Sequence, residues 1–268
     1  MTNFHTHTVL CDGKLTAEQM VKAAIDRGFT ALGFTGHSYL PFDNKWCMTP
    51  ATTRLYKETV LALREKYAGV IDIFLGVEQD YCSDTPTADY DYVIGSAHCI
   101  EIGGEYFSVD FRAEEQRRIV NDYYGGDFLP FIERYYKTVA DVHKKTNADI
   151  IGHFDLVSKF NEGCVFFDEN TARYKDAAIE ALESILKDHK LFEVNSGSMY
   201  KLGRTAPYPS VFLLKELFAR GGEVILSSDS HDANSLGYKF PEMTELIKAC
   251  GFRSRKIFTK NGFADVKL

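Results

Sequence analysis

Short, almost continuous apolar runs recur along this chain, and a longer amphipathic stretch follows each of them. Near-continuous apolar character, without the alternation of a half-exposed strand, is typical of parallel strands covered on both faces. After a short first strand ahead of His5, strands are predicted at residues 30–35, 71–76, 92–96, 148–152, 191–195 and 223–227. These runs constrain the fold more than any other feature of the sequence.

The segments between the runs carry the start and stop signals of helices. A capping-box pattern at residues 16–19 and a stop signal at Gly28 bound a helix predicted over residues 17–27. Further helices are predicted at residues 50–67, 130–146, 170–189, 209–220 and 241–249. Strand followed by helix, repeated about seven times, indicates an α/β barrel or a doubly wound sheet.

Length, net charge and cysteine spacing limit the kind of protein that this chain can be and the partners that it can bind. The chain has 268 residues, of which 45% are hydrophobic, so it is long enough for one large domain or two small ones. A formal net charge of −7 argues against a nucleic-acid backbone as the main partner. The six cysteines lack a Cys-x-x-Cys pair, and no signal peptide or long apolar segment is visible. We therefore expect a cytoplasmic protein without a membrane partner.

Histidines fall at the ends of the predicted strands. Of the eight histidines, only His143 and His189 are placed in predicted helices. The other six are His5, His7, His37, His98, His153 and His231. Carboxylates accompany them: Glu78 follows the third strand, Asp229 stands near His231, and Asp12 lies in the first loop. Because parallel strands end at one face of the fold, these side chains are expected to converge.

This convergence predicts a metal centre. Any one of these histidines alone is more often a hydrogen-bonded core residue than a ligand, so the prediction depends on the joint pattern. Imidazoles and carboxylates are costly to bury together unless cations satisfy them, and they are the usual ligands of Zn, Mn and Fe. His5 and His7 point to one side of an extended segment and can hold one ion. Nine candidates suit two or three divalent ions, with Glu78 bridging.

The same motifs resemble those of the PHP family, the polymerase-and-histidinol-phosphatase superfamily of metal-dependent phosphoesterases. They are His5-Thr6-His7, Asp12, Thr35-Gly36-His37-Ser38, Gly76-Val77-Glu78, Ser96-Ala97-His98, Ile151-Gly152-His153 and Ser228-Asp229-Ser230-His231. They occur in family order and span nearly the whole chain. Within that family, residues 152–156, 193–197 and 207–210 resemble segments of the stand-alone histidinol-phosphate phosphatases.

The resemblance implies a distorted (β/α)7 TIM-like barrel of PHP type and a trinuclear metal site. We expect a single domain over residues 1–268, with an insertion at about 99–129. The family pattern assigns ligands to each of the three ions. The first would be held by His5, His7, Glu78 and Asp229. The second would be held by Glu78, His98 and His153, and the third by Asp12, His37 and His231. One departure is Gly36, where many members carry an Asp, so another group is expected to orient His37.

The implied reaction is hydrolysis of a small phosphate monoester, histidinol phosphate, in histidine biosynthesis. A metal-bridging hydroxide would attack phosphorus, with Glu78, Asp229 and His231 in the catalytic centre. Asp12 or a metal-bound water would protonate the leaving group. Cations suited to phosphate lie on nearby loops, so Arg204 and Lys159, together with Ser38, are the predicted substrate contacts.

Three other functions fit parts of the pattern. A PHP phosphodiesterase or 3′-exonuclease would share the metal site, although the acidic charge argues against nucleotide polymers. An amidohydrolase-type barrel would favour a bridging Lys, whereas Glu78 stands where a bridge is needed. A non-catalytic metal-binding barrel would be expected to lack ligands. The oligomeric state and the native metals stay open.

Overall fold

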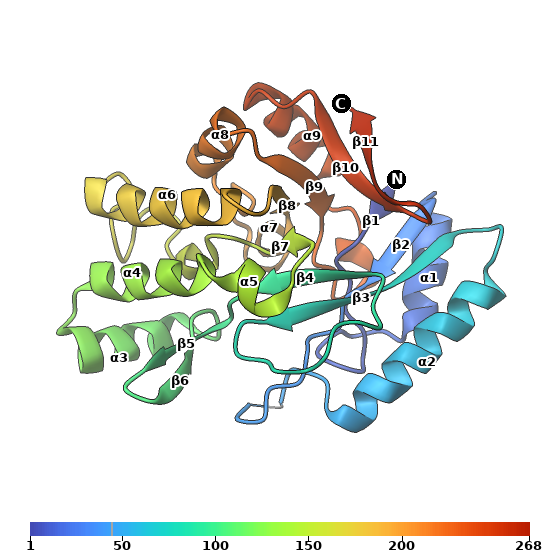
Figure 1. Ribbon diagram of the computed structural model, residues 1–268, viewed down its shortest axis with the longest axis horizontal. Helices are drawn as coiled ribbons and strands as arrows, with labels where there is room; N and C mark the ends of the chain where they lie inside the picture. Colours follow the sequence, from blue (N-terminus) through green and yellow to red (C-terminus); the bar gives the residue numbers. More distant parts are fainter. Residues whose placement is uncertain (44) are drawn as a thin grey trace.

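Seven parallel strands form the centre of the molecule. The computed structural model describes residues 1–43 and 45–268. In the sheet, parallel neighbours follow the order β1-β2-β3-β4-β7-β8-β9. Their bounds are β1 (Thr2–Asn3), β2 (Ala31–Phe34), β3 (Asp72–Asp80), β4 (Tyr92–Ser96), β7 (Ile150–Ile151), β8 (Leu191–Asn195) and β9 (Glu223–Ser227) (Figure 1). The predicted parallel strands are thus confirmed.

A single bridge joins the first and last of these strands just beyond their ends. Thr6 pairs in parallel with Ser230. The backbone N–H of His7 donates to the carbonyl of Ser230 at 2.8 Å, and that of Ser230 donates to the carbonyl of His5 at 3.1 Å. The sheet therefore curls into a distorted seven-stranded barrel, as the sequence predicts. The bridge also holds the two histidine-bearing segments together at the C-terminal end of the barrel.

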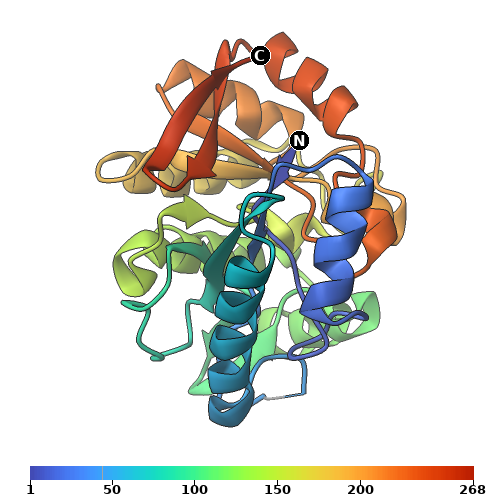
Figure 2. The same ribbon diagram turned by 90° about the vertical axis from the view of Figure 1, so that its right-hand side faces the viewer.

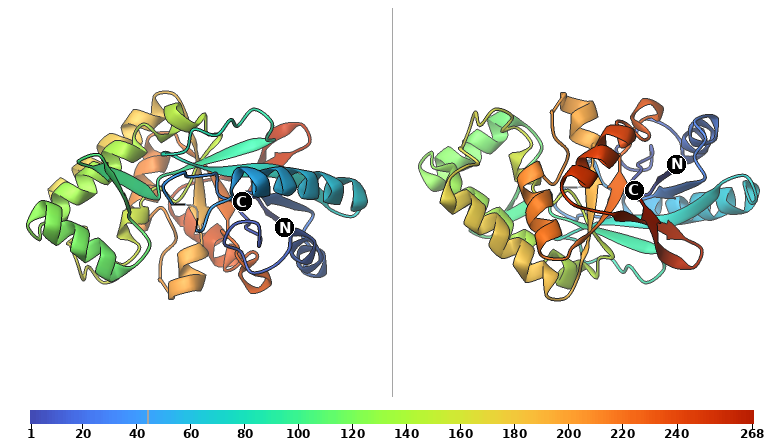
Figure 3. Two further views of the ribbon diagram at one scale, coloured as in Figure 1. Left: turned by 90° about the horizontal axis from the view of Figure 1, so that it is seen from below. Right: turned by 90° about the horizontal axis from the view of Figure 1, so that it is seen from above.

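Helices cover the outside of the sheet (Figure 3). They are α1 (Ala17–Asp26), α2 (Pro50–Lys66), α4 (Phe128–Val139), α5 (Val142–Thr146), α6 (Ala172–Leu186), α8 (Val211–Ala219) and α9 (Phe240–Ala249). The capping box at Thr16 is present, because its side chain accepts from the N–H of Gln19. The single helix predicted over 130–146 is instead two helices, and the helix predicted to reach His189 ends at Leu186.

Two expectations about local structure were wrong, and one hairpin was missed. The segment 99–129, expected to be largely irregular, contains a hairpin of β5 (Cys99–Ile102) and β6 (Glu105–Ser108), followed by α3 (Ala113–Tyr124). Its paired glycines, Gly103 and Gly104, have φ of 62° and 89° and form the tight turn of the hairpin. Glu78 lies inside β3 rather than beyond it. An antiparallel hairpin of β10 (Ser254–Thr259) and β11 (Gly262–Lys267) was not predicted.

This C-terminal hairpin continues the sheet beyond β9, where Lys256 of β10 pairs in parallel with Ile225, and it packs against one end of the barrel. Phe258 of β10 packs 5.0 Å from Phe74 and 5.1 Å from Tyr92, measured between ring centroids. The Tyr92 ring fits because β2 has no side chain at Gly33, where a Cβ would lie 2.1 Å from its hydroxyl. In Figures 1 and 2 the β10–β11 and β5–β6 hairpins lie at opposite ends of the molecule. Among the described residues, no helix is long and apolar enough to cross a membrane.

Candidate metal centre

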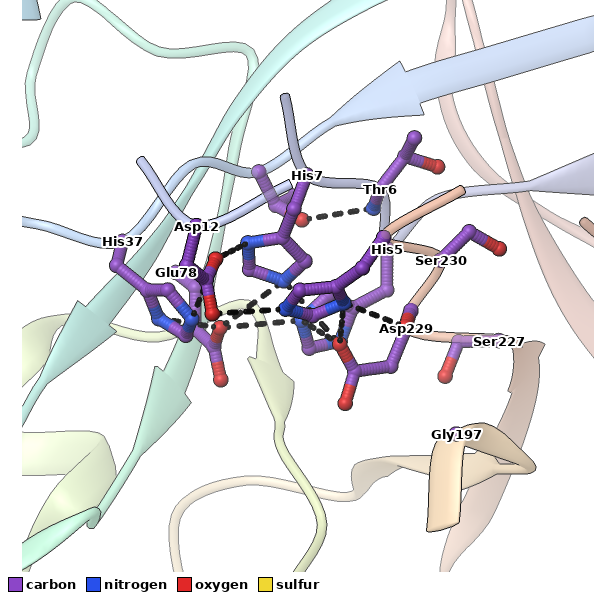
Figure 4. A network of polar contacts seen from close by, with 12 residues as sticks. His5, Thr6, His7, Asp12, His37, Glu78, Gly197, Ser227, Asp229 and Ser230 are labelled. Atoms are coloured by element: carbon purple, nitrogen blue, oxygen red, sulfur yellow. Dashed lines mark hydrogen bonds and ion pairs between the residues drawn. The ribbon is translucent and has the colours of Figure 1, made fainter. Parts of the chain in front are cut away.

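Glu78 lies at the middle of the predicted ligands (Figure 4). Its side chain is buried, and its two oxygens face different imidazoles. Oε2 lies 3.1 Å from His5 Nε2 and 2.9 Å from His37 Nδ1. Oε1 lies 3.3 Å from His98 Nε2 and 2.9 Å from His153 Nε2. A carboxylate that presents one oxygen to each side in this way is arranged to bridge two cations.

The two aspartates extend the cluster away from Glu78. Asp229 Oδ1 lies 3.2 Å from His7 Nε2 and 3.7 Å from His5 Nε2. Asp12 Oδ2 lies 3.0 Å from His231 Nε2, and its Oδ1 lies 3.5 Å from His7 Nδ1. The structure therefore brings all nine predicted residues together, although they are spread from residue 5 to residue 231.

Three overlapping groups in this cluster have donor atoms spaced for a metal ion. They are His5, His7 and Asp229; His37, Glu78 and His98; and His7, Asp12, His37 and His231. The first group is one of the sets implied by the family resemblance without Glu78, and the third is another implied set with His7 added. In the second, His37 stands where that resemblance places His153, although His153 also reaches Glu78.

The histidines and carboxylates of this cluster shift one another's pKa values. Although burial acts in the opposite direction, His37 and His5 hold the pKa of Glu78 well below its usual range. Burial lowers the pKa of His37, but Glu78 and Asp12 outweigh it and raise that pKa well above its ordinary value. His7 differs, because burial and the neighbouring His231 and His37 lower its pKa. A bound cation can take the place of the protons that this cluster shares.

One buried atom supports a metal at this position. His7 Nε2 makes no hydrogen bond to any residue that the structure describes, although it lies 3.2 Å from Asp229 Oδ1. A buried imidazole nitrogen without a partner is costly in a folded protein. The donor set of neutral imidazoles and carboxylates is the one that Zn, Mn and Fe use. The residues present therefore fit the expected metal ions.

Two carboxylates behind the ligands were missed in the sequence. Glu193 in β8 is buried and accepts from His5 Nδ1 at 2.8 Å and from the backbone N–H of His153 at 2.6 Å. Asp80, at the end of β3, lies 3.1 Å from His98 Nδ1. Such partners orient metal-binding imidazoles and fix which nitrogen is free. The sequence offered one indication of this role, because Glu193 is a charged residue inside the apolar run of residues 191–195.

His37 is held without an acidic neighbour at position 36. A Cβ on Gly36 would lie 3.0 Å from Met48 Sδ, so Met48 occupies the space beside this residue. His37 is instead positioned by Glu78 and by the indole of Trp46, which meets it edge to face at 4.7 Å. Another group does orient His37, as the departure from the family pattern predicts.

A cavity of about 750 Å³ opens above the cluster. Its floor includes His37, His98, His153 and His231, together with Asp12 and Asp229. Lys159 lines the wall and lies 2.8 Å from Asp110. Lys201, which the sequence did not single out, lies on α7 (Gly197–Leu202), with Nζ 3.4 Å from His231 Nε2. With Lys45, which also lines it, the cavity thus pairs a ligand-rich floor with three ammonium groups.

Two of the predicted substrate contacts lie behind this wall. Arg204 and Ser38 are buried, and neither lines the cavity in the described part of the chain. The Arg204 guanidinium donates to the carbonyl of Ser158 and lies 5.0 Å over the Tyr208 ring. The Ser38 hydroxyl accepts from the backbone N–H of Asp80 at 3.0 Å. Both side chains are already engaged in contacts within the protein. The structure therefore differs from the expectation that Arg204 and Ser38 touch the substrate.

Known proteins resemble this chain over most of its length. The sequence model of the PHP domain matches residues 3–197. A Deinococcus radiodurans protein described as a probable histidinol-phosphatase is 29% identical, covering 94% of this chain and 96% of its own. The histidinol-phosphatase of Bacillus subtilis is 23% identical, covering 90% and 97%.

Solved structures show the same fold. Histidinol phosphate phosphatase from Lactococcus lactis, determined with zinc, L-histidinol and phosphate, aligns with a TM-score of 0.70 at 20% identity and 98% coverage of both chains. That likeness supports the distorted barrel found here. Since the family model matches well over half of the residues, the chain belongs to the PHP domain family.

Proposed function

We propose that this protein is a metal-dependent phosphatase that hydrolyses L-histidinol phosphate to L-histidinol and phosphate. One observation carries the proposal: six imidazoles and two aspartates converge around Glu78 beneath a cavity that also presents Lys159 and Lys201. The names of the Deinococcus and Bacillus relatives supply the substrate class. The product and phosphate bound by the Lactococcus protein agree with it.

Three divalent ions would be held by the nine residues, in the sets that the family resemblance implies. His5, His7, Glu78 and Asp229 would hold the first, Glu78, His98 and His153 the second, and Asp12, His37 and His231 the third. Zinc is one candidate, since the Lactococcus protein contains it, and Mn and Fe suit the same donors. When bound, such ions polarise phosphoryl oxygens and lower the pKa of water towards ~7.

The residues around the ions then have separate tasks. Lys159 and Lys201 would balance the charge of the phosphoryl group as point charges. Asp12 and His231 lie at the rim, and their side chains contact each other at 3.0 Å. Asp12, or a water held beside it, would deliver a proton to the leaving oxygen, because its side chain lines the cavity next to the ligands.

The outer wall suits the organic part of the substrate. Histidinol carries a planar imidazole and an ammonium group. Trp46, Tyr106 and Phe107 give the cavity aromatic surface, and Asp110 gives it a carboxylate. Burial opposes ionisation of Asp110, but Lys159 and His98 lower its pKa, so it stays ionised at neutral pH. Aromatic faces and a carboxylate suit a planar ring that carries an ammonium group.

The test is phosphate release by protein loaded with zinc or manganese, compared with protein stripped by a chelator. We expect the loaded protein to hydrolyse histidinol phosphate and the stripped protein to be inactive. Glu78→Gln should abolish turnover, whereas Glu183→Gln, on the surface, should not. Degradation of single-stranded DNA in place of the monoester would favour the phosphodiesterase alternative. Full turnover without metal would reject the proposal.

A further inference from the structure

The cavity wall beside His153 contains buried polar atoms that have no hydrogen-bond partner among residues 1–43 and 45–268. They include Tyr208 Oη, Ser198 Oγ and His153 Nδ1. Tyr208 is 2% exposed and Ser198 is 5% exposed, yet both residues line the cavity. Native proteins leave few buried polar groups unpaired, and each one calls for an explanation. A hydrogen bond between the Tyr208 and Ser198 hydroxyls would still leave one of the two donors free, so this wall suits a ligand with acceptor atoms.

These hydroxyls are held on a firm support. The backbone of Tyr208 pairs with that of Asn195 at the end of β8, through hydrogen bonds of 2.7 and 3.0 Å. The guanidinium of Arg204 lies 5.0 Å over the Tyr208 ring. Ser198 lies in the first turn of α7, directly after the same strand. The pairing to β8 therefore fixes the backbone of Tyr208 at the cavity, and the Arg204 guanidinium packs against its ring.

The pair lies on the cavity wall next to the metal cluster. The ring of Tyr208 lies 6.4 Å from that of His153, one of the imidazoles that contact Glu78. Lys201 belongs to the same short helix as Ser198, and Lys159 lines the same cavity. A phosphate monoester has three strong acceptor oxygens, and each of them can accept more than one hydrogen bond. Hydroxyl groups add donors without adding charge, and hydrogen bonds to anionic oxygens are the strong ones.

We propose that Tyr208 Oη and Ser198 Oγ donate hydrogen bonds to phosphoryl oxygens of the bound monoester, and to phosphate after hydrolysis. The proposal rests on the proposed phosphatase function for its substrate class. It assigns a phosphate-binding role to two uncharged residues that are neither metal ligands nor cations. Arg204, which the sequence predicts as a phosphate contact, supports the tyrosine ring from behind.

The experiment compares Tyr208→Phe and Ser198→Ala with the metal-loaded wild-type protein. A matched control is Tyr136→Phe, which removes a buried hydroxyl that contacts Tyr174 at 3.2 Å. The readouts are the inhibition constant of inorganic phosphate, KM and kcat, measured with para-nitrophenyl phosphate and with histidinol phosphate. We expect the inhibition constant and KM to rise about 10-fold to 100-fold in each cavity variant, with smaller changes in kcat.

The control should keep the phosphate inhibition constant of the wild type, even if its melting temperature falls. Unchanged inhibition constants in both cavity variants would overturn the proposal and indicate that water satisfies the two hydroxyls. If histidinol phosphate is not hydrolysed but para-nitrophenyl phosphate is, the substrate assignment fails while the hydroxyl pair is still tested. If neither ester turns over, calorimetric titration of the zinc-loaded proteins with inorganic phosphate gives the same comparison.

Discussion

The Nδ1 atom of His5 lies 2.8 Å from Oε2 of Glu193, and both side chains are fully buried. A carboxylate can only accept, so this contact places the ring proton on Nδ1. The other nitrogen, Nε2, is left facing Glu78 and Asp229. Because Glu193 also accepts from the backbone of His153, one carboxylate positions two separate segments of the metal centre.

Glu193→Gln should weaken metal binding while leaving the barrel folded. The amide keeps the size of the side chain but loses the charge that orients His5, and such partners are worth about 10-fold to 100-fold in affinity. Competition between the protein and a coloured zinc chelator measures this change. Glu183→Gln, at a surface pair with Arg220, is the matched control. Equal zinc affinity in Glu193→Gln and wild type would show that Glu193 does not tune the centre.

Removing different ligands should remove different numbers of ions. His231 touches Asp12 and Asp229 at the rim, whereas Glu78 touches imidazoles on both sides. His231→Ala should therefore lower the metal content by one ion per chain, and Glu78→Ala should lower it by more. Elemental analysis of dialysed protein measures both. Identical losses in the two variants would contradict the assignment of His231 to an outer ion.

The stability of the metal-free protein should fall as the pH rises above about 6.5, the ordinary pKa of histidine. Burial lowers the pKa of His5, but Glu193, Glu78 and Asp229 outweigh it and raise that pKa well above its ordinary value. A raised folded-state pKa stabilises the protein below the unfolded pKa, and this contribution is lost as the pH rises through the raised value.

Bound zinc should remove this alkaline loss, because a metal ion replaces the shared protons. The measurement is the melting temperature against pH for stripped and zinc-loaded protein. The two curves should diverge towards alkaline pH. Parallel curves would mean that the histidine–carboxylate contacts contribute nothing to the stability of the metal-free state.

The barrel interior gives a test that is independent of metal. The Tyr92 hydroxyl donates to the carbonyl of Phe4 at 2.6 Å, so Tyr92→Phe should cost about 1–3 kcal/mol in the free energy of unfolding. Gly33→Ala should also cost about 1–3 kcal/mol, because its Cβ would meet that hydroxyl. Denaturant unfolding of the double variant should show less than the sum of the two costs. Strict additivity would contradict the close approach of Gly33 and Tyr92.

Much of the barrel was predictable because its strands are apolar on both faces. The observed bounds of β4, β8 and β9 coincide with the predicted ones. The strand β3 runs further than predicted, because Glu78 and Asp80 are polar residues whose partners lie on distant segments. The hairpin of β10 and β11 was missed, since its residues are partly exposed and mix charges with apolar side chains.

The ligands could be found from the sequence, whereas their supporting groups could not. Each histidine follows a strand, so its convergence with the others depends only on the direction of the parallel strands. Glu193 and Tyr208 act through contacts made in space, with His5 and with the wall beside His153. Arg204 and Lys201 lie three residues apart in the sequence, and only the path of α7 decides that Lys201 lines the cavity.

The preference of this protein for histidinol phosphate is measured by comparing kcat/KM across a panel of phosphate monoesters. The zinc-loaded protein would be assayed with histidinol phosphate, para-nitrophenyl phosphate, glycerol phosphate and a mononucleotide. The site described here predicts a kcat/KM for histidinol phosphate at least ~100-fold above that of every other ester. An equal or higher kcat/KM for any other ester would show that the cavity does not select histidinol phosphate.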